Sequence, residues 1–134
     1  PMAAAAANAV LDVLLNDNIL KNVNNSGDHL KDTLRAKFAQ HAHVGDIRGR
    51  GLFYGLEIVQ DRESKEPFPS SYGIARKIKS VAKDKGLLCY PMSGTVDGKK
   101  GDHVLLAPPY IINETEINNL STLLAESLDE AIES

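Results

Sequence analysis

The sequence predicts an α+β fold: a two-layer small domain in which a three- to four-stranded, mainly antiparallel sheet is covered on one face by helices. Two observations predict it. Segments with helical periodicity and short apolar runs follow one another in the order helix, helix, strand, helix, strand, strand, helix, which suits helices packed on one small sheet. The chain has 134 residues, of which 43% are hydrophobic and 25% charged, enough for one hydrophobic core.

Four segments are typical of helices. Residues 2–15 are rich in alanine and group their larger apolar side chains on one side. Residues 19–40 place Leu30, Leu34 and Phe38 at four-residue steps, with an expected irregularity near Ser26 and Gly27. A third helix is expected from residue 72 to about residue 85, and a fourth from residue 113 onward.

The two later helices carry end signals in the sequence. Ser70 or Ser71 is the expected N-cap of the third helix, which has lysines in its last turn and Gly86 beyond it. Asn113 is the expected N-cap of the fourth helix, with Glu116 three residues later as its capping-box partner.

Three short apolar runs are expected to be strands. Residues 52–59, "LFYGLEIV", are rich in aromatic and β-branched residues and too glycine-flanked for a helix. Residues 87–90, "LLCY", and 103–109, "HVLLAPP", flank a polar, glycine-rich stretch. We therefore expect these two runs to pair as antiparallel strands through a hairpin-like connection.

Glycines ahead of the first strand raise the question of a phosphate site. Gly49, Gly51 and Gly55 have a G-x-G-x-x-x-G spacing that is close to a dinucleotide-binding fingerprint. That fingerprint needs an apolar strand before the glycines and a helix N-terminus after them, where the pyrophosphate binds. Here a strand follows, so the sequence favours a strand bend at which backbone segments pack closely.

Composition narrows the classes of partner and the compartment. The net charge of −3 gives no electrostatic reason to expect nucleic acid or an anionic membrane. No window is long and apolar enough for a membrane span, and the opening residues lack the basic segment of a secretory signal. The single cysteine, Cys89, excludes an internal disulfide and indicates a reducing compartment, so we expect a cytoplasmic protein. Because Pro1 stands directly ahead of a helical pattern, we expect a piece of something longer.

The residues alone predict no complete active site. The four histidines, His29, His41, His43 and His103, have no acidic or cysteine partner at metal-ligand spacing, so no metal site is expected. Cys89 is expected in a buried strand as a core thiol. The ten lysines fall on predicted polar helix faces or in charged loops, where none would be desolvated enough to form a Schiff base.

Three segments in order resemble one known family. They are "HVGDIRGRGLFYGLEIVQDRESKEPF" at 43–68, "KGLLCYPMSG" at 85–94 and "GDHVLLAPPYIINETEINNL" at 101–120. Together they are similar to the C-terminal part of the class III aminotransferases, which are pyridoxal-phosphate enzymes of fold type I. The opening residues 1–23 also resemble the segment that leads from the large domain of such enzymes into the small one.

The resemblance implies a division of labour between this chain and a larger domain. Residues 1–18 would be a helix linking from the large domain, and residues 19–134 would be the small domain. The full-length parent would be a homodimeric transaminase that uses pyridoxal 5'-phosphate to move an amino group between an amine or amino acid and a keto acid. The Schiff-base lysine and other cofactor-binding residues of the family would lie before Pro1. This chain alone is therefore expected to be inactive and to bind no cofactor, and none of its residues is assigned a catalytic role.

The resemblance also raises a question about substrate binding. The small domain of such enzymes usually supplies an arginine for the substrate carboxylate, at one of two positions. Those positions are Tyr90 and Leu105 here, and neither is an arginine. Either another arginine binds the carboxylate, or the loop at residues 93–103 recognises the substrate. Tyr90 is the expected substrate-side residue, with a core or rim tyrosine as the alternative, whereas Arg48 and Arg50 are expected to pair with nearby carboxylates.

Two alternatives remain open. An aminomutase, racemase or decarboxylase on the same scaffold would have the same small domain, because this domain does not fix the reaction type. Outside this class, a stand-alone α+β ligand-binding or interaction module would need no cofactor. For the isolated chain, residues 3–10 form an apolar surface through which we expect self-association.

Overall fold

The computed structural model describes all residues from Pro1 to Ser134 and contains four α-helices and one four-stranded sheet. The elements in chain order are α1 (Met2–Asn16), α2 (Ile19–Phe38), β1 (Val44–Arg50), β2 (Phe53–Ile58), a 3-10 turn (Ser70–Tyr72), α3 (Ile74–Asp84), β3 (Tyr90–Ser93), β4 (Asp102–Leu106) and α4 (Glu114–Glu133).

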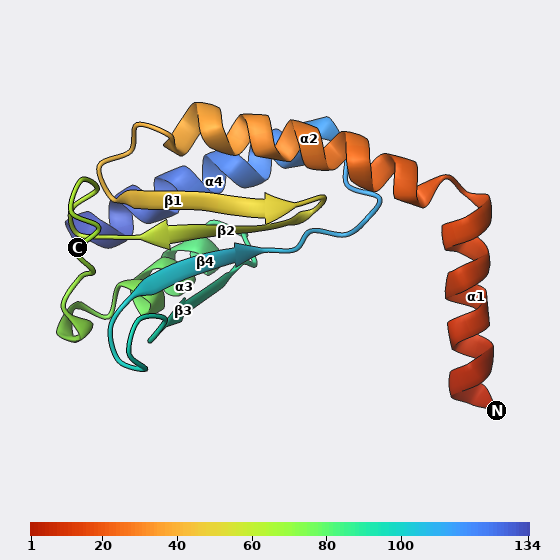
Figure 1. Ribbon diagram of the computed structural model, residues 1–134, viewed down its shortest axis with the longest axis horizontal. Helices are drawn as coiled ribbons and strands as arrows, with labels where there is room; N and C mark the ends of the chain where they lie inside the picture. The colour runs from red at the N-terminus through yellow and green to blue at the C-terminus, as the bar shows by residue number, and fades with distance from the viewer.

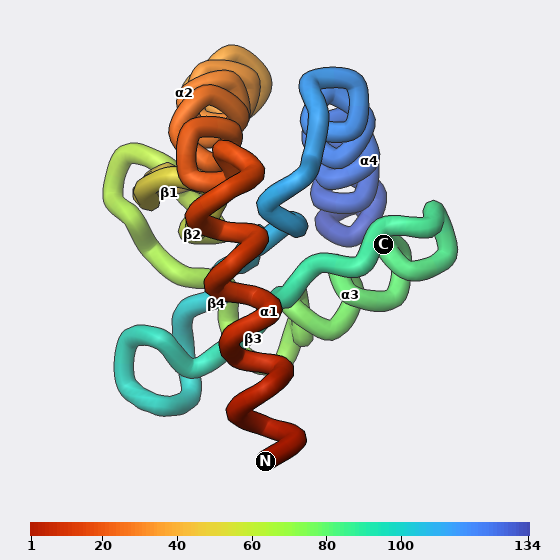
Figure 2. The backbone as a smooth tube through the Cα atoms, turned by 90° about the vertical axis from the view of Figure 1, so that its right-hand side faces the viewer, coloured from red at the N-terminus to blue at the C-terminus, as the bar shows by residue number.

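The sheet has the strand order β1-β2-β4-β3, and every neighbouring pair is antiparallel. Helices α2, α3 and α4 lie on one face of this sheet and leave its other face uncovered (Figures 1 and 2). The predicted α+β, two-layer arrangement is confirmed.

One hydrophobic core lies between the sheet and the three helices. Alternate residues of β2 and β4 point into it, because successive side chains of a strand face opposite sides of the sheet. The largest fully buried side chains come from all three helices as well as the sheet: Leu30, Leu34, Phe38, Leu56, Ile58, Ile74, Ile78, Val104, Ile117, Leu124 and Leu128.

Helix α1 contributes nothing to that core. It has no buried residue, and it projects from the start of α2 away from the sheet (Figure 1). Asn18, between the two helices, has the left-handed backbone conformation at φ 55°, which turns the chain sharply there. The division of the chain into a linking helix up to residue 18 and a small domain from residue 19 stays a prediction.

The helix ends agree with the sequence at α4 and differ at α3. The Asn113 side chain accepts a hydrogen bond from the Glu116 backbone N–H at 3.0 Å, and the Glu116 carboxylate accepts one from the Asn113 N–H at 3.0 Å, so the predicted capping box is confirmed. The prediction of Ser70 or Ser71 as the N-cap of α3 is wrong, because both form a separate 3-10 turn and Gly73, at φ 61°, precedes the helix.

Helix α2 is continuous through Gly27, contrary to the expected irregularity. Gly27 is buried where the helix crosses the turn between β1 and β2. A Cβ atom at this position would lie 2.5 Å from the backbone oxygen of Gly51, so the glycine serves close packing and not a helix distortion.

The glycine run is a hairpin, which corrects the prediction that the first strand begins at residue 52. Residues 44–50 already form β1, which turns at Gly51 (φ 57°) and Leu52 into β2. A Cβ atom on Gly49 would clash with the backbone of Phe53 and the ring of Tyr54, so backbone and side chain approach closely there, as expected. Because a strand and not a helix N-terminus follows the glycines, the arrangement is not that of a phosphate-binding loop.

Candidate functional site

Tyr90 and Leu105, the two positions singled out in the sequence, lie directly opposite each other in the sheet. Tyr90 begins β3 and is the register partner of Leu105 in β4. The neighbours of Leu105 on either side, Val104 and Leu106, are buried against the helices, so Leu105 and Tyr90 are on the uncovered face. Two positions 15 residues apart in the sequence are therefore one place in the structure.

An apolar pocket of about 360 Å³ surrounds this pair. Tyr90 itself is 60% exposed, so it is a rim residue and not a core residue. The lining contains no charged side chain, so the pocket suits an apolar group and offers a carboxylate no ion-pair partner. Its lining consists of Phe53, Leu88, Cys89, Tyr90, Leu105 and Ala107.

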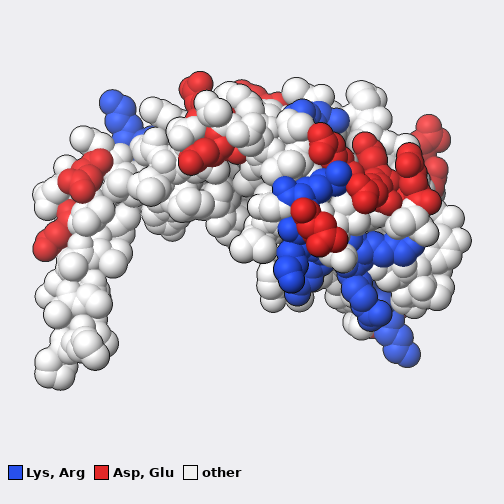
Figure 3. All heavy atoms as spheres, turned by 180° about the vertical axis from the view of Figure 1, so that it is seen from behind, with Lys and Arg blue, Asp and Glu red and all other residues white.

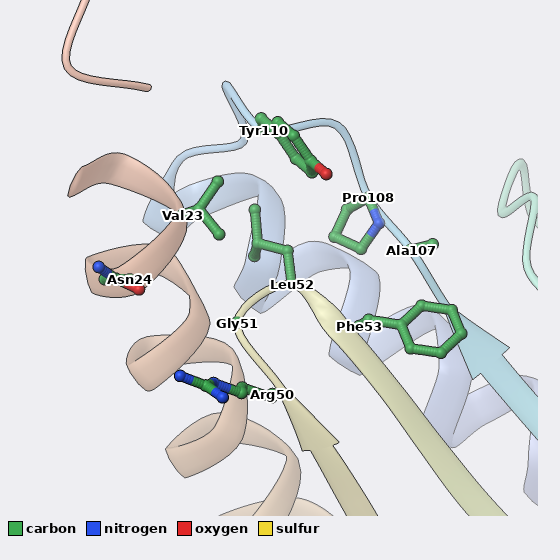
Figure 4. A pocket seen from close by; sticks show the side chains of 9 residues that line it. All are labelled: Val23, Asn24, Arg50, Gly51, Leu52, Phe53, Ala107, Pro108 and Tyr110. Atoms are coloured by element: carbon green, nitrogen blue, oxygen red, sulfur yellow. The ribbon is translucent and has the colours of Figure 1, made fainter. Parts of the chain in front are cut away.

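A second pocket, of about 460 Å³, adjoins the first at the tip of the β1–β2 hairpin. It lies between α2, the hairpin turn and the segment that follows β4, and Arg50 is one of its lining residues (Figure 4). Phe53 and Ala107 line both pockets. The remaining lining residues are Val23, Asn24, Gly51, Leu52, Pro108 and Tyr110.

The two arginines of the hairpin have different surroundings. Arg48 forms ion pairs with Asp46 at 2.6 Å and Glu57 at 3.7 Å, which confirms the prediction for this residue. Arg50 has no carboxylate within 4.0 Å, so the same prediction is wrong for Arg50. Its charge is free to meet an anion.

The loop proposed as an alternative recognition element lies at the opposite end of the β3–β4 hairpin. Ser93 and Asp102 are register partners at that end, whereas Tyr90 and Leu105 pair at the other. The loop is held by the Asp97 carboxylate, which accepts hydrogen bonds from the backbone N–H groups of Lys99 and Lys100 at 2.9 and 2.7 Å. These bonds, chiefly the one from Lys100, lower the pKa of Asp97.

Cys89 lies just before β3, not in a buried strand as predicted. It is half-buried, and its partial burial raises the pKa of the thiol, which disfavours the thiolate form. Cys89 therefore contributes an apolar wall to the pocket and not a nucleophile.

The lysines have surroundings unlike those of a Schiff-base lysine. None is buried. The pKa of Lys31 is raised by its hydrogen bond to Asp28, and the pKa of Lys85 is raised chiefly by its hydrogen bond to Glu130. A Schiff-base lysine needs burial and a lowered pKa, so Lys31 and Lys85 do not fit covalent attachment of a carbonyl cofactor.

His41 contacts Asp129, an acidic residue far away in the sequence, and the sequence analysis did not predict this contact. His41 Nε2 lies 2.9 Å from Asp129 Oδ1, a residue of α4 that is 88 positions away. The His43 backbone N–H donates to His41 Nδ1 at 3.1 Å, so His41 carries its proton on Nε2 and donates to Asp129. No group of three or more His, Cys, Asp or Glu side chains is arranged to hold a metal ion.

A third hollow, of about 380 Å³, lies between α1 and the segment after β4. Its lining is entirely apolar, and Figure 3 shows the first turns of α1 without charged side chains. None of the helices is both long and apolar enough to cross a membrane. The hollow is lined by Ala9, Val10, Val13, Leu14, Ile19, Tyr110 and Ile111.

Comparison with known proteins places this arrangement in a family. The family model described as aminotransferase class-III matches residues 1–128. An uncharacterised aminotransferase of Schizosaccharomyces pombe is 42% identical over 132 residues, which are 98% of this chain and 29% of the relative. The chain thus spans less than a third of the length of the curated relatives that it matches.

Solved structures agree with the sequence comparison. An aminotransferase of Bacillus anthracis superposes with a TM-score of 0.86 at 32% identity, over 97% of this chain and 28% of its own. A PLP-bound aminotransferase mutant of Vibrio fluvialis superposes with a TM-score of 0.80 at 29% identity, over 91% of this chain and 25% of its own. Since the family match extends over nearly every residue from the first helix into the last, the chain belongs to the class III aminotransferases.

Proposed function

We propose that this chain is the C-terminal small domain of a pyridoxal-phosphate-dependent aminotransferase whose full-length form transfers an amino group between an amine or amino acid and a keto acid. The observation that carries the proposal is the pairing of Tyr90 with Leu105 over an apolar pocket on the uncovered sheet face of a chain from this family. When bound, pyridoxal phosphate supplies an electron sink for such a transfer.

A larger domain of the same enzyme would hold the cofactor. The proposal rests on two facts: the chain covers only about a quarter of the solved relatives, and none of its lysines is buried. We accordingly expect this chain alone to be inactive and to bind no cofactor. The apolar first turns of α1, which bury nothing within the chain, suit contact with that larger domain.

Tyr90 is assigned to the substrate side in this proposal. Its ring stands at the rim of a pocket without any charged group, where it would orient the apolar part of a substrate and exclude water from it. Arg50 is the candidate for binding a substrate carboxylate, because its guanidinium group has no carboxylate partner and lines the adjoining pocket. The loop at residues 93–103 is less suited, since it lies at the other end of the hairpin.

For the full-length enzyme we propose a homodimer in the cytoplasm. Oligomers of a single chain are most often two-fold dimers. The single cysteine is free and forms no disulfide, which suits a reducing compartment.

The test uses the full-length protein that contains this chain, loaded with pyridoxal phosphate. Apolar amines and amino acids are offered as donors with pyruvate as acceptor, and alanine is measured. We expect amino transfer, with kcat/KM for apolar donors lowered about tenfold or more by Tyr90→Ala and nearly unchanged by Tyr90→Phe, because the ring makes the contact.

Met92→Ala is the matched control. Met92 lies on the same strand and the same face as Tyr90 but does not line the pocket. Racemised or decarboxylated donor without any alanine formed would contradict amino transfer and support another reaction of the superfamily. Equal loss of activity in the Met92 and Tyr90 variants would contradict the role given to Tyr90.

A further inference from the structure

The ring of Phe53 separates the two pockets described above. Phe53 is the first residue of β2, directly after the turn at Gly51 and Leu52, and it remains 57% exposed. Phe53 and Ala107 are the two residues that line both pockets. Because Ala107 carries only a methyl group, the phenyl ring of Phe53 is the larger of the two shared side chains. Figure 4 shows both at one edge of the pocket at the hairpin tip.

On the uncovered face, Phe53 has Arg50 as its register partner across the hairpin and a glycine two residues further along β2. The next residue of β2 on that face is Gly55, opposite Leu105. A Cβ atom on Gly55 would lie 3.3 Å from Leu105 Cδ2, so the leucine side chain leans over the glycine. Without Phe53, the space over Leu105 would therefore open toward the hairpin tip.

The two pockets that Phe53 lines differ in polarity. The pocket at Tyr90 has only hydrophobic lining residues, whereas the pocket at the hairpin tip contains Arg50 and Asn24. The other charged residues of β1, Asp46 and Arg48, pair with each other, and Arg48 also pairs with Glu57 of β2; none of the three lines either pocket. An exposed phenyl ring in this position would contact an apolar group bound beside Tyr90.

We propose that Phe53 is a specificity-determining residue, which limits the size of the apolar substituent that a substrate can place against Tyr90 and Leu105. The inference rests on the proposed function, since it concerns the amine or keto substrate of the transfer. With the ring in place, a substituent is confined to the pocket of about 360 Å³. Without the ring, that pocket joins the neighbouring one of about 460 Å³.

The experiment compares two amine donors in the full-length, cofactor-loaded protein. One donor is 2-aminobutane, and the other is 4-phenyl-2-aminobutane, which differs by a terminal phenyl group. In Phe53→Ala we expect the ratio of kcat/KM for the larger over the smaller donor to rise about tenfold or more, since even one methylene in an apolar pocket is worth about tenfold. Phe53→Tyr should restore the original ratio, and Met92→Ala should leave it unchanged.

Binding is measured beside turnover so that the two proposals fail separately. Calorimetric titration of both amines into the same proteins reports the size preference even where no amino transfer occurs. Absence of alanine together with a shifted binding ratio in Phe53→Ala would reject the aminotransferase proposal and support the role of Phe53. A folded Phe53→Ala protein that retains its melting temperature and cofactor absorbance, but keeps the original ratio in both assays, would overturn the inference.

Discussion

The absence of a side chain at Gly27 allows α2 to pack directly against the backbone of the β1–β2 turn. The helix α2 rests on the β1–β2 turn at this residue, where a Cβ atom would lie 2.5 to 2.7 Å from three backbone atoms of Gly51. Backbone cannot move aside as a flexible side chain does. We expect Gly27→Ala to lower the free energy of unfolding by about 2 kcal/mol, although alanine favours helix by about 1 kcal/mol.

Gly55→Ala is the control for this prediction. Its nearest neighbour would be the tip of the Leu105 side chain at 3.3 Å, which can shift slightly, so we expect a change within about 0.5 kcal/mol. Urea unfolding of both variants measures the difference. Equal stability of Gly27→Ala and the unmodified chain would show that the helix can move away from the turn at no cost.

Asp102 makes the stability of the protein depend on pH. Its side chain is buried, which raises the pKa of the carboxyl group, and the backbone N–H of Ala75 at the start of α3 opposes that shift only in part. A raised pKa in the folded state means that the folded chain binds the proton more tightly than the unfolded chain does. Stability from this group is therefore fully present below the ordinary pKa of 3.8 and is lost as the pH rises through the raised pKa of the folded state.

Asp102→Asn tests that assignment. Asparagine keeps an oxygen for the Ala75 N–H and removes the charge, so we expect the variant to be at least as stable as the unmodified chain at pH 7. The advantage should shrink as the pH falls to 4. Urea titrations at both values measure it. A variant that is less stable at pH 7 only would mean that the ionised carboxylate stabilises the start of α3 by more than its burial costs.

The residues of the candidate site could be predicted only in part. Tyr90 followed from the resemblance of its segment to a family, and Leu105 followed in the same way. The antiparallel pairing of their two runs was predicted, but the register that sets Tyr90 opposite Leu105 was not, because the length of a loop of glycines and charged residues does not fix it. His41 and Asp129 were missed for the same kind of reason, since their contact joins α4 to a loop 88 residues earlier.

At the scale of elements, the capping box of α4 can be tested directly. Asn113→Ala removes the acceptor for the Glu116 N–H, and we expect a loss of about 1 kcal/mol in the free energy of unfolding. Asn113→Asp keeps an acceptor and should retain most of that stability. Asn119→Ala, at an exposed position inside the same helix, is the control. Thermal unfolding of the three variants gives the comparison, and equal melting temperatures for Asn113→Ala and Asn119→Ala would contradict it.

Strand β1 is the element that the sequence did not predict. It is an edge strand with one neighbour, and its exposed positions carry Asp46, Arg48 and Arg50. Charged residues at edge strands prevent pairing with other chains, yet together with glycines they give the composition of a loop. The neighbouring strand β2 was predicted because its buried positions hold large apolar side chains on both sides of Gly55.

At the scale of the whole molecule, the uncovered surface of α1 predicts association of the isolated chain. The hollow between α1 and the segment after β4 is apolar throughout, and α1 buries no residue of its own. We expect the 134-residue chain to self-associate in sedimentation experiments and Val10→Asp to shift it toward the monomer. Asn8→Asp adds the same charge on α1 outside the hollow and should have less effect.

A strictly monomeric chain at high concentration would contradict that expectation. Equal sedimentation of the two aspartate variants would instead show that net charge, and not the hollow, governs association.

The overall fold class could be predicted from the alternation of helical and strand patterns, because the core is built from regular apolar spacing in α2, α3, α4, β2 and β4. The exposed position of α1 could not be predicted, since an alanine-rich sequence is equally compatible with a buried helix and with an exposed one.

The pairing of residues 90 and 105 also affects how enzymes of this kind should be compared and redesigned. Suppose that one relative carries a charged side chain at position 90 and another carries it at position 105. A sequence alignment that scores each position separately would count these as two unrelated changes. Because residues 90 and 105 are register partners, a side chain at either position projects over the same part of the uncovered face. Redesign of this site should therefore vary both positions together as a single unit.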